Sequence, residues 1–121
     1  MPARTPQEVH TLFVDAFNRS DIEELVALYE PNAIFVSGSV IAKGHDAIRE
    51  AYQGILAAGG RMELETLTLL DSGDGLGMLH ASWTIRGDSF VRVGISTEVV
   101  RRQLDGTWLF VIDEPRTAEI S

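Results

Sequence analysis

The sequence predicts an α+β fold, and two observations lead to that prediction. Apolar residues recur at helical spacing through roughly the first half of the 121-residue chain. Long strand-like segments fill the second half, separated by the turn sequences SGDG, GDS and DG. Helices followed by an antiparallel meander are expected to pack on one face of the sheet. The length suits a single domain spanning residues 1–121.

A capping signal opens the first helix. Thr5 and Glu8 form a capping box, with Pro6 at the first helical position. Apolar residues, among them Phe13 and Phe17, then recur at helical spacing over about 14 residues. The sequence therefore predicts an amphipathic helix that packs on the sheet.

The same capping pattern recurs further along the chain. Ser20 and Glu23 are expected to cap a short second helix, which includes Tyr29 and which Pro31 ends. A short strand is expected at residues 33–37 (AIFVS).

A third helix and four strands complete the prediction. The segment GHDAIREAYQGILAAGG has helical periodicity, and its final pair of glycines is typical of a helix end. The four expected strands are RMELETLTLLD, LGMLHASWTIR, FVRVGISTEVVRRQL and TWLFVIDEP. Strands this long suggest a strongly curved sheet that wraps around the helices.

Composition narrows the classes of partner. The formal net charge of −8 argues against a nucleic-acid or anionic-membrane partner, because both need a basic face. No cysteine is present for disulfides, thiolate metal sites or cysteine catalysis. The polar amino-terminal segment does not resemble a signal peptide, and no apolar stretch approaches the ~20 residues of a membrane span. A cytoplasmic protein is expected.

Three segments carry a resemblance that covers nearly the whole chain: SDIEELVALYEPNAIFVSG, KGHDAIREAY and DGTWLFVIDEP. In their order and spacing the chain resembles the NTF2-like superfamily, and within it the SnoaL-like and ketosteroid-isomerase-like branch. The resemblance implies a cone, in which three amino-terminal helices close over a strongly curved antiparallel or mixed sheet. A pocket is then expected between helices and sheet. The fold hosts many activities, so it does not by itself identify a function.

The resemblance also allows the residues needed for steroid isomerase activity to be compared with this sequence. The isomerase branch has a tyrosine on the first helix, an aspartate base after the first strand and a protonated acid on a later strand. Alignment places Phe13, Ser37 and Glu98 at these positions. Phenylalanine cannot donate a hydrogen bond, and a serine hydroxyl is no base without a partner that takes its proton. Steroid isomerase activity is therefore not expected.

Alignment and the two-residue period of strands assign residues to the two sheet faces. Expected to face inward are Ala81, Trp83, Ile85, Ser96, Glu98, Leu109, Val111 and Asp113. Trp108, Phe110 and Ile112 are expected on the outer face. Three large apolar side chains there predict a homodimer that packs through the outer sheet face, which is also common in the resembling family.

Glu98 and Asp113 are the candidate catalytic residues. Two carboxylates on neighbouring inward strands repel each other, which raises the pKa of one and makes it an acid while the other remains a base. The alternative is structural: Asp113 accepts backbone N–H groups at the strand end or pairs with Arg49 or Arg61.

Further residues are expected to contact a ligand. They are Phe13, Phe17, Tyr29, Ser37, Tyr52, Trp83, Ile85, Ser96 and Val111. The two tyrosines either orient a ligand oxygen or one of the acids, or are core residues with satisfied hydroxyls. Trp83 forms either an aromatic wall or ordinary core. A one-residue slip decides whether Ser37 or Ser39 faces the pocket.

The histidines and glycine turns give little support for a metal or cofactor. His10 and His45 are expected at the surface or in caps, and His80 on the outer face. The three histidines have no i, i+4 pairing, so no metal site is expected. The turns SGSV and GDGLG do not join a strand to a helix as a phosphate loop does.

Three functions fit the sequence. The first is a cofactor-independent enzyme that binds a small, mostly apolar, cyclic or polyketide-like molecule and performs isomerase, cyclase or hydratase chemistry through Glu98 and Asp113. The second is a ligand-binding module without chemistry, which the replaced tyrosine and aspartate favour. The third is a structural dimer whose pocket has no role.

Overall fold

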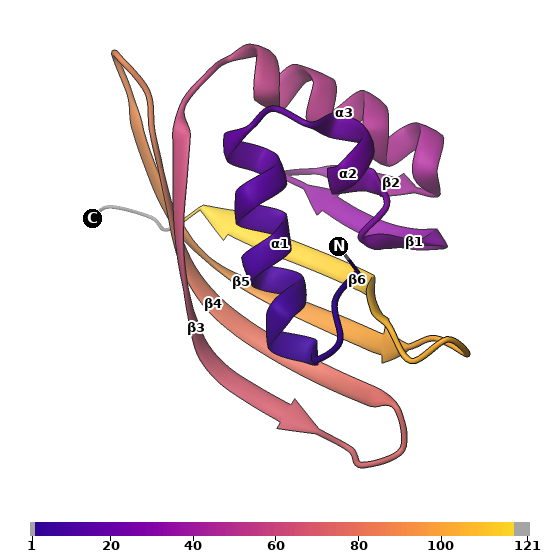
Figure 1. Cartoon of the computed structure of the whole chain (residues 1–121). Coiled ribbons are helices and arrows are strands. Elements are labelled where there is room, and N and C mark those ends of the chain that lie inside the picture. The colour runs from indigo at the N-terminus through magenta and orange to yellow at the C-terminus, as the bar shows by residue number, and fades with distance from the viewer. Residues whose placement is uncertain (1, 118–121) are drawn as a thin grey trace.

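The chain folds into helices packed on one side of a curved sheet (Figure 1). The computed structural model describes residues 2–117, and in that part of the chain it contains three helices and one six-stranded sheet. The α+β class and the curved mixed sheet predicted from the sequence are confirmed.

The helices are α1 (Pro6–Asn18), α2 (Ile22–Val26) and α3 (His45–Ala57). The predicted cap of α1 is present, because the Thr5 hydroxyl accepts a hydrogen bond from the Glu8 backbone N–H at 3.3 Å.

The region around α2 differs from the prediction. The N-cap is Asp21 rather than Ser20, and its carboxylate accepts a backbone N–H of the first turn at 3.2 Å. Ser20 instead has a φ of 54°, which lets the chain turn sharply between the two helices. The expectation that α2 includes Tyr29 and ends at Pro31 is also wrong, since both residues lie in β1 (Tyr29–Ser37).

The remaining strands are β2 (Val40–Lys43), β3 (Arg61–Asp71), β4 (Leu76–Arg86), β5 (Val91–Arg102) and β6 (Trp108–Thr117). Their order in the sheet is β2-β1-β6-β5-β4-β3. The predicted antiparallel meander of the last four strands is confirmed. Two features were not predicted: the short hairpin strand β2, and the parallel pairing of β1 with β6.

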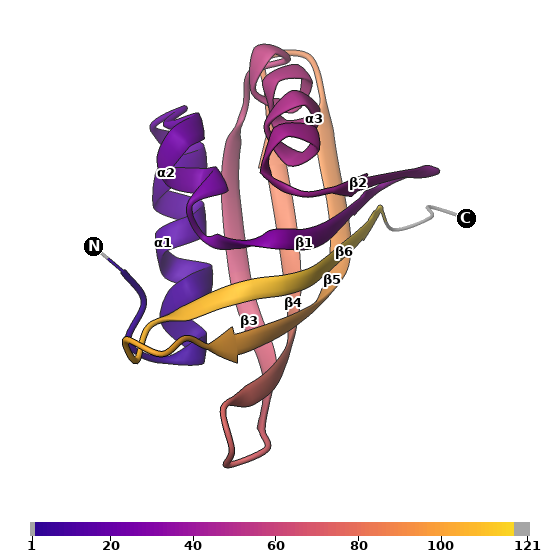
Figure 2. The same cartoon turned by 90° about the vertical axis from the view of Figure 1, so that its right-hand side faces the viewer.

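The two long helices cover different strands of the sheet. Figure 2 shows α1 running along the inner side of the strands, whereas α3 lies beside β1 and β2. The Asn18 side chain fastens the end of α1 to β3, since it donates to the Met62 carbonyl at 2.9 Å and accepts the Met62 N–H at 2.7 Å. α1 thus lies mainly over β3, and α3 lies mainly over β1 and β2.

A β-bulge interrupts β6. Val99 of β5 pairs with Ile112, but the next residue, Val100, pairs with Phe110. Val111 is thus an extra residue with no counterpart in the ladder, which is how a bulge re-aims the side chains that follow it.

The bulge overturns the predicted faces of β6. Trp108 and Phe110 point inward and are only 5% and 1% exposed, so the expectation that they lie on the outer face is wrong. Leu109 and Val111, which were expected to face inward, are half-buried, and Ile112 does lie on the outer face. The two-residue period fails here because Val111 shifts it by one.

Among residues 2–117, none of the helices combines the length and the apolar character that crossing a membrane requires.

Candidate functional site

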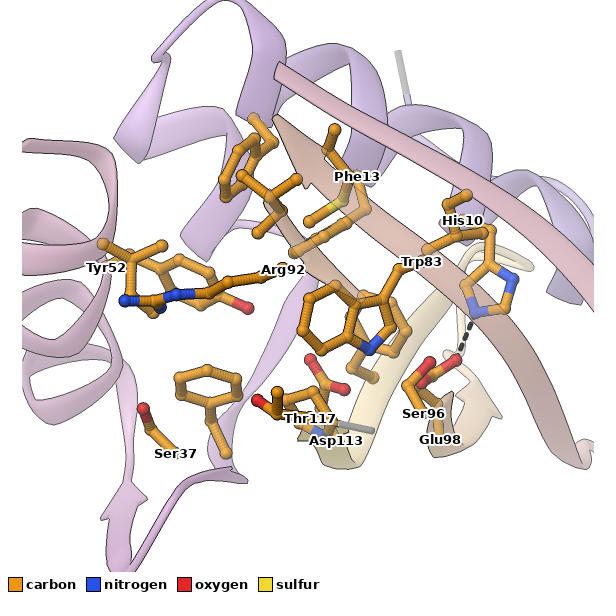
Figure 3. Close-up of a pocket in the computed structure, with 18 of the residues that line it drawn as sticks. His10, Phe13, Ser37, Tyr52, Trp83, Arg92, Ser96, Glu98, Asp113 and Thr117 are labelled. Atoms are coloured by element: carbon orange, nitrogen blue, oxygen red, sulfur yellow. Dashed lines mark hydrogen bonds and ion pairs between the residues drawn. The ribbon is translucent and has the colours of Figure 1, made fainter. Parts of the chain in front are cut away.

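The space between α1, α3 and the inner sheet face contains a cavity of about 140 Å³ (Figure 3). Cavities of ~150 Å³ in other proteins hold one benzene molecule. Drug-sized ligands fill roughly 300 Å³ or more. The cavity therefore has room for a single ring with small substituents.

Aromatic and aliphatic side chains make up most of the wall. The lining residues are His10, Phe13, Phe17, Phe35, Ser37, Gly38, Tyr52, Ile55, Met62, Leu64, Trp83, Ile85, Arg92, Ser96, Glu98, Phe110, Asp113, Pro115 and Thr117. This set includes both predicted catalytic residues and seven of the nine predicted ligand contacts. The other two, Tyr29 and Val111, lie elsewhere.

The two exceptions have separate causes. Tyr29 is fully buried behind Asp113 and reaches the site only through its hydroxyl. Val111 is the extra residue of the β6 bulge, and Phe110 takes the place on the wall that was expected for it. At β1 the open question is settled: Ser37 lines the cavity, whereas Ser39 is exposed in the following turn.

The two carboxyl groups lie opposite each other on adjacent strands. Glu98 of β5 and Asp113 of β6 are register partners, and they are 2% and 5% exposed. Asp113 accepts a hydrogen bond from the Tyr29 hydroxyl at 2.5 Å, and the Tyr29 and Tyr52 hydroxyls are 2.8 Å apart. The tyrosines thus hold one carboxyl oxygen of Asp113 in place.

Burial raises the pKa of Asp113 well above its ordinary value, and the charge of Glu98 raises it further. The hydrogen bond from Tyr29 lowers this pKa by a smaller amount. Burial is likewise the main reason why the pKa values of Tyr29 and Tyr52 lie well above that of free tyrosine. All three groups therefore favour their protonated forms. Neither arginine of the structural alternative pairs with Asp113 in residues 2–117: Arg49 pairs with Glu23 and Asp46 at the surface, and Arg61 is exposed at the start of β3.

His10 belongs to the site, and the expectation that it is a surface or capping residue is wrong. It is 3% exposed, its Nε2 is hydrogen-bonded to the Glu98 carboxyl, and its Nδ1 lies 2.8 Å from the Thr66 hydroxyl oxygen. The sequence does indicate that His10 faces the cavity, because His10, Phe13 and Phe17 are spaced i, i+3, i+7 and therefore share one face of the helix. A chain from Thr66 through His10 to Glu98 thus orients the second carboxyl.

Arg92 is another wall residue that the sequence reasoning missed. Period-2 alternation places it on the same face of β5 as Gly94, Ser96 and Glu98. The other histidines lie outside the cavity wall: His80 of β4 contacts Thr97, with 3.2 Å between its Nδ1 and the hydroxyl oxygen, and the His45 Nε2 lies 2.7 Å from the Tyr29 carbonyl oxygen. Within residues 2–117, no three acidic or histidine side chains gather as metal ligands would.

The site thus offers two kinds of proton chemistry side by side. A neutral Asp113 can donate a hydrogen bond or a proton, and the His10-bound Glu98 carboxylate can accept a proton. Mostly apolar walls surround both groups, which strengthens their electrostatic interactions with anything bound between them.

Several solved structures share the fold. An NTF-2-like protein of unknown function from Shewanella oneidensis is 17% identical, with a TM-score of 0.79 and coverage of 89% of this chain and 93% of that one. A ketosteroid isomerase-like protein from Erwinia carotovora atroseptica is 18% identical, with a TM-score of 0.77 and 94% coverage of both chains. A provisionally assigned scytalone dehydratase from Novosphingobium aromaticivorans is 18% identical, with a TM-score of 0.79 and coverage of 93% and 81%.

Identities this low establish the fold alone. No curated protein matches the sequence. The SnoaL-like domain family, in contrast, matches residues 10–120, which is nearly the whole chain and includes every strand that carries the site. The protein is therefore a member of the SnoaL-like domain family, with the NTF2-like fold.

Proposed function

We propose that this protein binds a small, mostly apolar cyclic molecule in the cavity and moves a proton within it without a cofactor. The observation that carries the proposal is the buried carboxyl pair, in which Asp113 lies directly opposite Glu98 and has its pKa raised by burial and by the Glu98 charge. Such a pair separates an acid from a base within one apolar site.

The roles follow from the contacts of each carboxyl. Glu98 accepts a proton from a carbon next to a ligand carbonyl, while His10 keeps the carboxylate oriented. As that C–H bond breaks, its electron pair forms a carbon–carbon double bond, and the carbonyl oxygen takes a hydrogen bond or proton from Asp113. Return of the proton from Glu98 to another carbon completes an isomerisation. Alternatively, the proton held by Glu98 goes to a β-hydroxyl, which leaves as water and completes a dehydration.

Enolisation of a single-ring ketone tests the proposal. Cyclohexanone in D₂O exchanges its α-protons for deuterium, and we expect the protein to accelerate this exchange. Glu98→Gln should lower the protein-dependent rate by about 100-fold or more, because general base catalysis contributes at least that factor. Proton NMR follows the loss of the α-proton signal, and binding is measured in parallel from ligand-induced shifts.

The two readouts separate the possible outcomes. Binding without accelerated exchange would refute the catalytic proposal and leave a ligand-binding module. Absence of both would refute the ligand-binding role of the cavity as well. Glu65→Gln, at an exposed position of β3, serves as the matched control and should leave both readouts unchanged.

A ligand-binding module without chemistry is the second candidate. Phe13 supplies only an apolar ring at the place where the resembling isomerases have a tyrosine, and it packs edge-on against Tyr52 and Phe110, with 5.9 Å between ring centroids in both pairs. A module of this kind retains ligand-dependent thermal stabilisation in the Glu98→Gln and Asp113→Asn variants.

We also propose a homodimer that forms through the outer sheet face. Four apolar residues follow one another across adjacent strands in that face: Leu70, Met78, Val99 and Ile112. Three of them have substantial exposure, at 56% for Leu70, 37% for Met78 and 39% for Ile112. A continuous apolar row on a sheet is a surface that association would bury.

A further inference from the structure

Two polar atoms in the cavity wall have no hydrogen-bond partner among the described residues. They are the indole Nε1 of Trp83 and the hydroxyl of Ser96, in residues that are 9% and 4% exposed. Figure 3 shows the indole nitrogen on the side of Trp83 that faces Ser96 and Asp113. Buried donors are nearly always satisfied, because an unmade hydrogen bond is unfavourable. An acceptor atom of a ligand placed between them would satisfy both.

The cavity also has a cation in its wall. Arg92 is exposed at the start of β5 and forms no ion pair with an acid of residues 2–117. Its guanidinium carbon lies 5.7 Å from the centroid of the Phe90 ring. In Figure 3 the guanidinium points away from His10 and Glu98, toward the α3 side of the cavity. Its fork of N–H donors suits a carboxylate.

The surroundings of Arg92 favour an anion at this end of the cavity. A neighbouring surface groove is lined by Arg61 and Arg86 as well as Arg92, with Asp88 as its acid. The acids Glu98 and Asp113 lie further along the inner face. Glu98 is six residues from Arg92 on β5, which is about 20 Å along the strand. The negatively charged end of a ligand is therefore attracted by Arg92 at the mouth of the cavity and repelled by the acids at its deep end. This fixes the orientation of the ligand in the cavity.

We infer that the ligand is a small ring-bearing keto acid. Its carbonyl oxygen accepts hydrogen bonds from Trp83 and Ser96, on the side of the indole where Asp113 also lies, and its carboxylate pairs with Arg92. Ser96 lies four residues from Arg92 on the same face of β5, about 13 Å between backbones, and both residues line the cavity, so one ligand with an arm between its ketone and its carboxylate meets them at separate points. The inference rests on the proposed binding role of the cavity and adds the chemical class of the ligand.

Three matched probes test the two contacts separately. They are 4-oxo-4-phenylbutanoate, its primary amide, which lacks the charge, and 4-phenylbutanoate, which lacks the keto oxygen. Dissociation constants are measured by NMR titration or calorimetry. The keto acid is expected to bind at least about tenfold more tightly than the amide, because the amide lacks the charge-assisted hydrogen bonds. It is expected to bind severalfold more tightly than the deoxo acid, which lacks only neutral hydrogen bonds.

Variants assign each preference to its residue. Arg92→Gln should abolish the preference for acid over amide, and Trp83→Phe or Ser96→Ala should reduce the preference for keto over deoxo. Arg19→Gln, an arginine at the surface end of α1, should keep both preferences.

The outcomes distinguish this inference from the proposed function. Equal affinity for acid and amide, or a preference that survives Arg92→Gln, would overturn the anion assignment. Equal affinity for the keto and deoxo acids would overturn the carbonyl contact, with water satisfying Trp83 and Ser96 instead. Failure of all three probes to bind would count against the binding role of the cavity itself.

Discussion

Burial of the Asp113 carboxyl links the stability of the fold to pH. The unfolded chain releases this proton near the ordinary carboxyl value of ~4, whereas the folded chain keeps it to higher pH because burial and the Glu98 charge raise the pKa. Between the two pKa values the folded state binds more protons. The contribution of Asp113 to stability is therefore complete below the unfolded value and decreases as pH rises toward the folded value.

Asp113→Asn should remove this dependence, since the amide resembles the neutral acid and still accepts from the Tyr29 hydroxyl. At pH 8 we expect the variant to melt a few degrees above the wild type, given that about 1 kcal/mol corresponds to roughly 4 °C in a domain of this size. At pH 4 the two should melt together. Calorimetry between pH 4 and pH 8 measures the difference in melting temperature between variant and wild type. A difference that grows toward acidic pH would contradict the prediction.

The His10–Glu98 pair should behave as one unit. His10→Phe leaves the buried Glu98 carboxylate without its partner, and we expect it to cost about 3–5 kcal/mol in the free energy of unfolding. Adding Glu98→Leu should restore much of that loss, because two apolar side chains then replace two paired polar ones. Urea unfolding of the two single variants and the double variant gives the coupling; additive losses would show that the pair is not coupled.

Single residues were predictable where they followed a simple period. Glu98 was assigned to the inner face together with Ser96, and β5 keeps that alternation. Asp113 also faces inward, although the period that assigned it fails at Leu109 and Val111. His10 was missed because its polarity outweighed its spacing with Phe13 and Phe17. Arg92 was missed because a charged residue at a strand end is usually solvated, and only the neighbouring Gly94 and Ser96 indicate that it shares the cavity face.

At the scale of elements, β5 must carry a glycine to leave room for the cavity wall. A side chain at Gly94 would collide with the Arg116 carbonyl and with the indole of Trp83. We expect Gly94→Ala to destabilise the fold by about 1–3 kcal/mol, the usual range for overpacking, and to change the near-ultraviolet circular dichroism of Trp83. Gly54→Ala is the matched control: it lies exposed in α3 with no atom near the added methyl group, and should stabilise by up to about 1 kcal/mol.

The elements themselves were largely predictable, with errors of a definite kind. α1, α3 and the four long strands followed from periodicity and turn residues. The cap of α2 was misplaced because Ser20 and Asp21 are both good capping residues and the sequence does not choose between them. Strand β2 is four residues long, too short for alternation to identify. The bulge in β6 carries no glycine or proline that would mark it.

At the scale of the molecule, the proposed dimer gives the clearest test. Met78→Glu or Ile112→Glu would bury a charge in the apolar row of the outer sheet face, and we expect either to shift the mass from twice 13.3 kDa to the monomer value. Light scattering coupled to gel filtration measures this mass. Leu104→Glu, at a fully exposed position in the β5–β6 turn, should leave the dimer intact. A monomeric wild type at micromolar concentration would refute the proposal.

Arrangement in space was the least predictable part. The parallel pairing of β1 with β6 joins segments about 80 residues apart, and local periodicity carries no information about such a contact. The resemblance supplied the cone and the curved sheet. Side-chain detail then set the cavity volume of about 140 Å³, which no pattern in the sequence expresses.

The unpaired Val111 divides β6 into two stretches of opposite phase. Before it, even-numbered positions such as Trp108 and Phe110 build the core; after it, odd-numbered positions such as Asp113 and Pro115 face the cavity. Sliding this irregularity two places toward the carboxyl terminus would turn Ile112 inward and withdraw the aspartate, with no change in composition. The acidity of the cavity thus depends on the position of the bulge as well as on the residues that the strand contains.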